Sequence, residues 1–356
     1  MRPHDDARGP VDWPAAGRLA GRLAPPGPTA PAPTLVALVD ELRAAAARAA
    51  DEVQAISGLR PADGRPAAAL SRVLVVDRAG WAAANTQVFA AMTEGLTLGS
   101  GSRMGSGSRS GRVAAAGEVG TVLALLSSRV LGQFDPFVDP AGRLLLVAPN
   151  VLEVQRRLGV DAHDFRLWVC LHEQTHALQF AASPWLVTHL RTRIAGLVHE
   201  VGPERLLGAG DVGELAVAAV RAVRGRDGTG ILDLLSPAAR QVFDEIGAVM
   251  ALLEGHADVT MDQVGPAVVP TVRSIRARFE ARRDAGAAST GLSGVLRRML
   301  GMDLKLAQYR DGAAFVRDVR RRVGADGFNA VWTSPDTLPT AAEISDPAAW
   351  VARVRP

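Results

Sequence analysis

His172-Glu173-Gln174-Thr175-His176 is an H-E-x-x-H motif, and it decides how the rest of this chain is interpreted. Residues four apart share one face of a helix, so His172 and His176 can bind one metal ion together. Glu173 is about 100° around the helix from His172, beside the metal rather than on it. A general base needs that position to take a proton from an attacking water molecule. The motif therefore predicts a zinc site with His172 and His176 as ligands and Glu173 as the catalytic base.

The residues around the motif predict a buried helix. Asp161 can cap its start, and Pro184 gives it a natural stop. Apolar residues at helical spacing share one stripe with both histidines, which therefore face the interior. The alternative is a core helix whose histidines bind nothing, but a glutamate between paired histidines favours the metal site. Cys170 lies about 200° from His172 and is expected to be a small buried residue rather than a ligand.

A third ligand is expected from a second helix that starts at Ser236-Pro237 and stops at Gly265-Pro266. Glu254 interrupts the apolar stripe of that helix, and a buried carboxylate needs a partner such as a metal ion or an arginine. Asp258, one turn further, could accept the free ring N–H of a ligating histidine. His256 is the rival ligand, but it points about 200° away from Glu254 unless Gly255 distorts the helix.

A helix with HExxH followed by a helix with ExxxD resembles the gluzincin branch of the zincin-like metallopeptidases. Longer stretches are similar to a bacterial family of uncharacterised zinc-dependent metalloproteases, also labelled as hydrolases associated with deazaflavin-coenzyme biosynthesis. The similar stretches are Leu144 to Asn150, Asp164 to Glu173, Leu253 to Asp258, Gln308-Tyr309 and Phe328 to Trp332, with Val11 to Trp13 and Val75 to Arg78 near the start.

That resemblance implies a zincin-like catalytic region and metal-assisted hydrolysis. Zn2+ held by His172, His176 and Glu254 would activate water, with Glu173 as the base. Tyr309, the only tyrosine, is our candidate for stabilising the oxyanion, although an ordinary half-buried tyrosine fits the sequence equally well. His256 and His199 are further candidates for that role.

Composition favours helices in a chain of 356 residues, 48% of them hydrophobic but only 4% aromatic. A core built from Ala, Leu and Val predicts a mainly α protein with a small β-sheet (α+β), a zincin-like metallopeptidase core with additional helices. The single cysteine excludes an intramolecular disulfide and fits a reducing compartment. No stretch is apolar enough to span a membrane, and the first residues do not look like a signal peptide, so we expect a cytoplasmic protein.

Three regions are expected along the chain: an N-terminal arm (1–33), a helical region (34–135) with a flexible Gly/Ser insertion (99–111), and a zincin-like catalytic region (136–356). Helices are predicted over Thr34 to Ile56, Trp81 to Glu94 and Val113 to Phe134, and strands over Val73 to Val76 and Arg143 to Val147. We expect Arg143 to Val147 to be the edge strand of the cleft, where an extended peptide could pair with it.

The partner expected for this site is a peptide or protein substrate. The formal charge is +3, and arginines cluster at Arg273 to Arg283 and Arg317 to Arg322. A solvated helix face balanced by carboxylates explains these clusters better than a nucleic-acid site, since no aromatic residues are interleaved with them. The main alternative to a hydrolase is a zinc-binding zincin-fold protein with a scaffold role and no proteolysis, but such a protein would not need Glu173.

Overall fold

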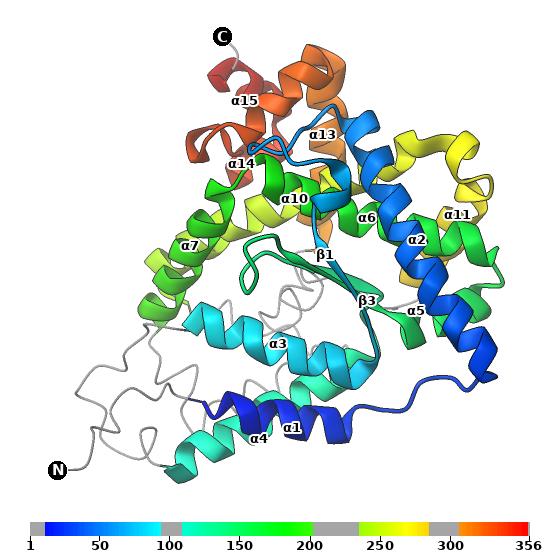
Figure 1. The fold of residues 1–356 in the computed structure, drawn as a ribbon. Helices are drawn as coiled ribbons and strands as arrows, with labels where there is room; N and C mark the ends of the chain where they lie inside the picture. The colour runs from blue at the N-terminus through cyan, green and yellow to red at the C-terminus, as the bar shows by residue number, and fades with distance from the viewer. Residues whose placement is uncertain (1–10, 94–108, 202–234, 285–305, 355–356) are drawn as a thin grey trace.

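The computed structural model describes residues 11–93, 109–201, 235–284 and 306–354 (Figure 1). Helices predominate around one small sheet, which confirms the mainly α class with a small β-sheet. The elements in chain order are α1 (Trp13–Leu23), α2 (Ala32–Ser57), η1 (Ala67–Ala69), β1 (Arg72–Val76), α3 (Arg78–Thr93), α4 (Arg109–Ser127), β2 (Gly132–Asp135), β3 (Arg143–Val147), α5 (Ala148–Leu158), α6 (Ala162–Ala182), α7 (Trp185–Val201), α10 (Pro237–Val268), α11 (Val272–Asp284), α13 (Leu306–Phe328), η4 (Asn329–Trp332), η5 (Pro335–Thr337), α14 (Ala341–Ser345) and α15 (Pro347–Val354).

The three described strands form a mixed sheet in the order β1-β3-β2. β1 runs parallel to β3 with Arg72 opposite Arg143, and β2 runs antiparallel to β3 with Phe134 opposite Leu144. The prediction that Arg143 to Val147 is the edge strand is therefore wrong: it is the central strand. Its consecutive apolar residues are buried on both faces, which is typical of an inner strand.

The helix predicted over Val113 to Phe134 was too long. α4 ends at Ser127, and Phe134 lies in the edge strand β2. Tertiary contacts override the apolar run here, because the side chain of Gln133 is fully buried and pairs with polar groups of α3. The predicted helices near Thr34 and Trp81 and the strand near Val73 are confirmed as α2, α3 and β1. Most of the Gly/Ser insertion (99–111) lies outside the described residues.

The sheet separates two layers of helices (Figure 1). Leu145 and Val147 of β3 pack with Trp81 of α3 and Leu123 of α4. Leu144 and Leu146 face the opposite way and join the core shared by α2, α6 and α10. β1 and β2 belong to the region 34–135, and β3 belongs to the region 136–356, yet all three form one sheet. Side chains of both regions also belong to one hydrophobic core.

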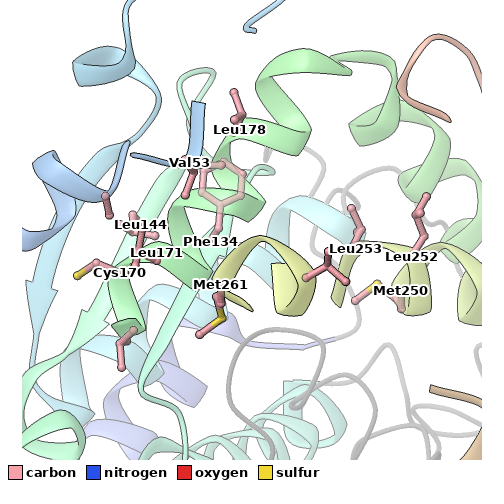
Figure 2. Packing of buried hydrophobic residues seen from close by; sticks show 14 of the residues in the cluster. Val53, Phe134, Leu144, Cys170, Leu171, Leu178, Met250, Leu252, Leu253 and Met261 are labelled. Carbon is pink, nitrogen blue, oxygen red and sulfur yellow. The ribbon is translucent and has the colours of Figure 1, made fainter. Parts of the chain in front are cut away.

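The larger core is built around α6. Figure 2 shows Leu171 and Leu178 of α6 among the buried side chains that α10 contributes, including Leu252, Leu253 and Met261. α6 is buried on every side, whereas α2 and α10 pack against it with one face each. A helix in this position can present polar side chains only to a site inside the protein.

α10 and α13 cross at two glycines. A Cβ atom on Gly255 would lie 2.2 Å from the carbonyl carbon of Gly312, and one on Gly312 would lie 2.1 Å from the carbonyl oxygen of Ala251. Gly255 therefore serves close helix packing and does not distort α10. The predicted stop is confirmed at Gly265, where a φ of 68° breaks the helix before Pro266.

The described part of the N-terminal arm is tied to the body of the protein. α1 packs against α3 and α4. The buried Arg78 donates hydrogen bonds to the carbonyl groups of Pro25 and Pro26, and its guanidinium also pairs with Asn150 and Glu153. These contacts hold the proline-rich run against the start of α5.

Carboxylates lie beside the arginine clusters. Arg276 of α11 and Arg317 of α13 both pair with Asp262 of α10, while Arg321 and Arg322 pair with Asp318 on their own helix.

Within the described ranges, no helix combines the length and hydrophobicity that crossing a bilayer requires.

Candidate metal centre

α6 brings the HExxH residues together within little more than one turn. Its predicted cap is confirmed, since the Asp161 carboxylate accepts a hydrogen bond of 2.9 Å from the backbone N–H of Asp164. Every residue from Asp164 to Gln179 is buried. Gln174 has its own partner within the core, since its amide donates to the Ala46 carbonyl.

Three side chains converge as a ligand set for a metal ion: His172, His176 and Glu254. The Nε2 atoms of the two histidines are 3.1 Å apart, and their rings are nearly perpendicular. Carboxylate oxygens of Glu254 lie 3.7 Å from Nε2 of His172 and 3.4 Å from Nε2 of His176. Tetrahedral zinc with ligands at about 2.0–2.1 Å separates its ligand atoms by about 3.3 Å. The nitrogen and oxygen donors and their spacing therefore fit zinc.

The regular helix around Gly255 makes Glu254 and His256 diverge. Glu254 faces the two histidines of α6, whereas the fully buried His256 packs against the rings of Phe328 and Trp332, with centroids 5.4 and 5.2 Å away. Burial lowers the pKa of His256 to about 3, so this imidazole is neutral. His256 is thus placed behind the site, not in the ligand set.

Gln179, which the sequence analysis did not single out, orients His176. Its Nε2 lies 2.9 Å from the carbonyl oxygen of Leu253, which can only accept, and 3.0 Å from Nδ1 of His256. Its Oε1 is then the atom 2.9 Å from Nδ1 of His176, so that nitrogen must donate. In the neutral imidazole of His176 the lone pair is then on Nε2, the atom that faces Glu254 and His172. A hydrogen bond of this kind fixes the tautomer of a metal-binding histidine.

Met261 and Gln179 contact the ring nitrogens for which we expected Asp258 to be the acceptor. The Nδ1 atom of His172 lies 3.3 Å from Sδ of Met261, and that of His176 is engaged by Gln179. Both ring nitrogens for which Asp258 was the expected acceptor therefore have other neighbours. The reason is the position of α10, which presents Met261 to α6 two turns after Glu254.

Glu173 lies against the edge strand. Only 1% of this residue is exposed, and a Cβ atom on Gly132 of β2 would lie 2.6 Å from its Cγ. Burial raises the pKa of Glu173 to about 8, although His176 and the backbone N–H of Phe134 favour the charged form. Among the described residues, its Oε2 atom has no hydrogen-bond partner. That oxygen is itself buried, at the inner end of the site.

Without a metal ion, the pKa values of the two ligand histidines are shifted in opposite directions. Burial lowers the pKa of His172 to about 4, and His176 adds to this effect. Burial also disfavours protonation of His176, but its hydrogen bond to Glu254 and the charge of that carboxylate outweigh burial and raise its pKa to about 9. A cation entering the site therefore competes with a proton held between His176 and Glu254.

Buried polar contacts fix β2 beside the site. The amide of Gln133 accepts from the indole of Trp81 at 2.8 Å and donates to Asn85 at 3.0 Å. The fully buried Asp135 pairs with Arg143 of β3, whose Nε lies 2.8 Å from its Oδ2. The strand that touches Glu173 is thereby held at both ends of its short length.

The outer edge of β2 faces the site with backbone groups. The N–H of Val147 donates to the carbonyl of Leu131 at 2.9 Å, so these two residues form a hydrogen-bonded pair. Antiparallel ladders alternate, so the backbone groups of Gly132 and Phe134 point away from β3. β2 therefore occupies the edge position that we had expected for Arg143 to Val147.

The other predicted site residues take different places. Tyr309 lies in the first turn of α13, and its side chain falls outside the described residues. His199 is exposed near the end of α7. Cys170 is fully buried, and burial together with the charge of Glu173 raises the pKa of its thiol, so it is a core residue as expected.

Sequence reasoning missed Gln179 and Gly132. Gln179 follows His176 by three residues, so the shared helix face could have indicated that it contacts the histidine. No local signal marks Gly132, because its contact with Glu173 depends on how the sheet packs against α6.

Two comparisons with known proteins cover almost the whole chain. A family model described as zincin-like metallopeptidase matches residues 11–351. A protein from Chloroflexus aurantiacus, described as "a putative hydrolase with a novel fold", has a similar crystal structure with a TM-score of 0.67. It is 29% identical in sequence, and the alignment covers 96% of this chain and 98% of that one. No curated protein matches the chain. The similarity thus extends from α1 to α15 and is not confined to the HExxH motif.

Proposed function

Since the chain belongs to the zincin-like metallopeptidase family, we propose that it is a zinc-dependent metallohydrolase that cleaves a peptide or amide bond. The observation that carries this proposal is the convergence of His172, His176 and Glu254 with Glu173 beside them. The resemblance to a structure described as a hydrolase supports the same reaction class.

The three ligand side chains would hold the ion. When bound there, zinc supplies Lewis-acid polarisation of a carbonyl group and lowers the pKa of water at its open position. His176 is kept in the tautomer that leaves Nε2 free, through the hydrogen bond from its Nδ1 to Gln179.

Glu173 would act as the general base and then as the general acid. Its carboxylate takes a proton from the attacking water and later returns it to the leaving amine. The narrow space beside Gly132 restricts how the carboxylate can turn, and the backbone N–H of Phe134 helps to hold it. Tyr309 remains our candidate for stabilising the oxyanion.

An extended peptide or protein segment is the substrate form that β2 favours. The outward backbone groups that do not contact Glu173, those of Gly132 and the carbonyl group of Phe134, would pair with such a segment by hydrogen bonding. The pairing of the described α11 and α13 arginines with Asp262 and Asp318 supports this substrate over a nucleic acid.

Replacing the base tests the proposal. Glu173→Gln keeps the shape of the side chain but cannot accept a proton as a carboxylate does. We expect it to retain zinc while amide cleavage falls at least about 100-fold, as is usual when general acid–base catalysis is lost. Cleavage is measured on a diverse peptide library with zinc-loaded wild type as reference and Glu200→Gln, at an exposed position of α7, as the matched control.

Two results would count against the proposal. An unchanged cleavage rate in Glu173→Gln would exclude Glu173 as the base. Absence of any cleavage by the zinc-loaded wild type would favour a zinc-binding scaffold protein.

A further inference from the structure

An apolar pocket opens directly beside the metal-binding group. His176 and Glu254 form part of its wall, so the pocket and the candidate metal centre are continuous. The space inside it, counted together with the open solvent at its mouth, is about 770 Å³, so the wall encloses only part of that volume.

The rest of the wall is apolar and comes from five elements and one adjoining loop. It includes Phe89, Phe134, Phe137 and Phe180, which are four of the nine phenylalanines in a chain with few aromatic residues. Apart from His176 and Glu254, the wall formed by the described residues carries no ionisable side chain. Away from the metal-binding end, a negatively charged ligand group would find no cation in this wall. The pocket therefore suits an uncharged apolar group.

The pocket is placed where it can position a reacting bond. Phe134 belongs to its wall and lies two residues from Gly132, against which Glu173 packs. A group inserted between Phe134 and α10 would hold the adjoining part of the ligand beside Glu173 and Glu254. Apolar pockets with a few polar groups at one end are typical of sites that bind and orient a substrate.

We propose that this pocket binds an uncharged apolar group of the substrate, attached next to the bond that is cleaved. This inference rests on the proposed function and specifies its substrate class. Two sources share the chemistry: an aromatic side chain of a peptide and the acyl chain of an N-acyl amide. Both would bury apolar surface against the phenylalanines and leave the amide at the polar end, near His176 and Glu254.

The first experiment tests the pocket in metal-free protein, where catalysis plays no part. N-phenyl-1-naphthylamine, an uncharged apolar fluorophore, is titrated into the full chain. We expect saturable binding that Ile194→Trp weakens at least about tenfold, because the indole would fill space used by the ligand. Ile194 is half-buried and lines the pocket from α7. The matched control is Val187→Trp, on the same helix but outside the pocket wall, which should bind the fluorophore as wild type does.

A second variant guards against misfolding of the first. Met92→Trp fills the pocket from α3, where Met92 is also half-buried. Circular dichroism and thermal unfolding establish which variants are folded. The proposal is overturned if wild type does not bind the fluorophore, as would happen if another segment of the chain filled the pocket. It is equally overturned if a folded Ile194→Trp or Met92→Trp binds as tightly as wild type.

The second experiment links the pocket to the metal and separates the two sources. Zinc-loaded protein is titrated calorimetrically with acetohydroxamate, 3-phenylpropionohydroxamate and octanohydroxamate. The two larger ligands should bind at least about tenfold more tightly than acetohydroxamate, because they bury apolar surface. Ile194→Trp should remove that advantage without weakening acetohydroxamate. The tighter of the two larger ligands identifies an aromatic or an acyl group as the natural occupant.

The failures can be told apart. If the protein binds no zinc and no hydroxamate but still binds the fluorophore in the Ile194-dependent way, the metallohydrolase proposal fails and the pocket remains. If all three hydroxamates bind equally to the zinc-loaded protein, the pocket does not contribute to substrate recognition and the present inference is overturned.

Discussion

α6 and α10 both supply the candidate metal centre, but in different ways. α6 provides His172, Glu173 and His176 within five consecutive residues, so helix geometry alone brings them together. α10 provides a single ligand, Glu254, whose position depends on where the helix crosses its neighbours. The first half of the site is encoded locally, and the second half is encoded by packing.

The glycines at the crossing of α10 and α13 illustrate the second case. Gly255 is directly next to Glu254, and it has no room for a side chain because the backbone of Gly312 lies against it. Gly255 does not itself bind the metal, but its close packing determines how far the carboxylate of Glu254 reaches toward α6. Around α6 the supporting contact is a side-chain hydrogen bond, from His176 to Gln179.

Removing ligands from the two helices should have the largest effect. We expect wild type to bind about one zinc per chain, and His172→Ala/His176→Ala to bind less than about a tenth of that, because a catalytic zinc site needs three protein ligands. Glu254→Ala should weaken zinc binding far more than His256→Ala. Zinc content after dialysis, measured by inductively coupled plasma mass spectrometry, gives both comparisons. A double histidine variant with full zinc content, or a larger loss in His256→Ala, would show that the ligand set is wrong.

Adding a methyl group at the helix crossing should be the next largest perturbation. Gly255→Ala places a Cβ against the backbone of Gly312, which cannot move aside as a side chain could. Overpacking of this kind costs about 3 kcal/mol at the upper end of its usual range, and it should also reduce zinc affinity by displacing Glu254. Urea unfolding of metal-free protein measures the first effect and chelator competition the second.

Gly196→Ala on α7 is the matched control for the helix crossing. A Cβ atom there would meet nothing within 4 Å. This substitution should leave zinc affinity unchanged and stabilise the helix by about 0.5–1 kcal/mol. Equal stability of Gly255→Ala and Gly196→Ala would remove the proposed role of packing in the placement of Glu254.

The contrast between the helices also explains what could be predicted from the sequence. The buried HExxH helix, its cap at Asp161 and the divergence of Glu254 and His256 follow from helical spacing, and the structure has all three. The central position of β3, the strand at Phe134 and the contact of Glu173 with Gly132 depend on long-range pairing. No local pattern encodes those contacts, so β3 was expected at the edge of the sheet and Phe134 in a helix.

Changing the orienting hydrogen bond should give the smallest of the three effects. Gln179→Leu removes the acceptor for Nδ1 of His176 and should weaken zinc binding about 10- to 100-fold, as is usual for residues that orient a metal ligand. Gln179→Glu keeps an acceptor oxygen and should restore part of that affinity, which a purely structural role would not explain. Asp258→Ala should weaken zinc less than Gln179→Leu, and the opposite order in chelator competition would return the orienting role to Asp258.

Anomalous diffraction at the zinc absorption edge tests the central claim most directly, since it locates the ion without reference to any substrate. Crystals of the zinc-loaded protein should show one strong peak about 2.0–2.2 Å from Nε2 of His172, Nε2 of His176 and a carboxylate oxygen of Glu254. A zinc peak elsewhere in the chain, or one with His256 in place of Glu254, would contradict the account.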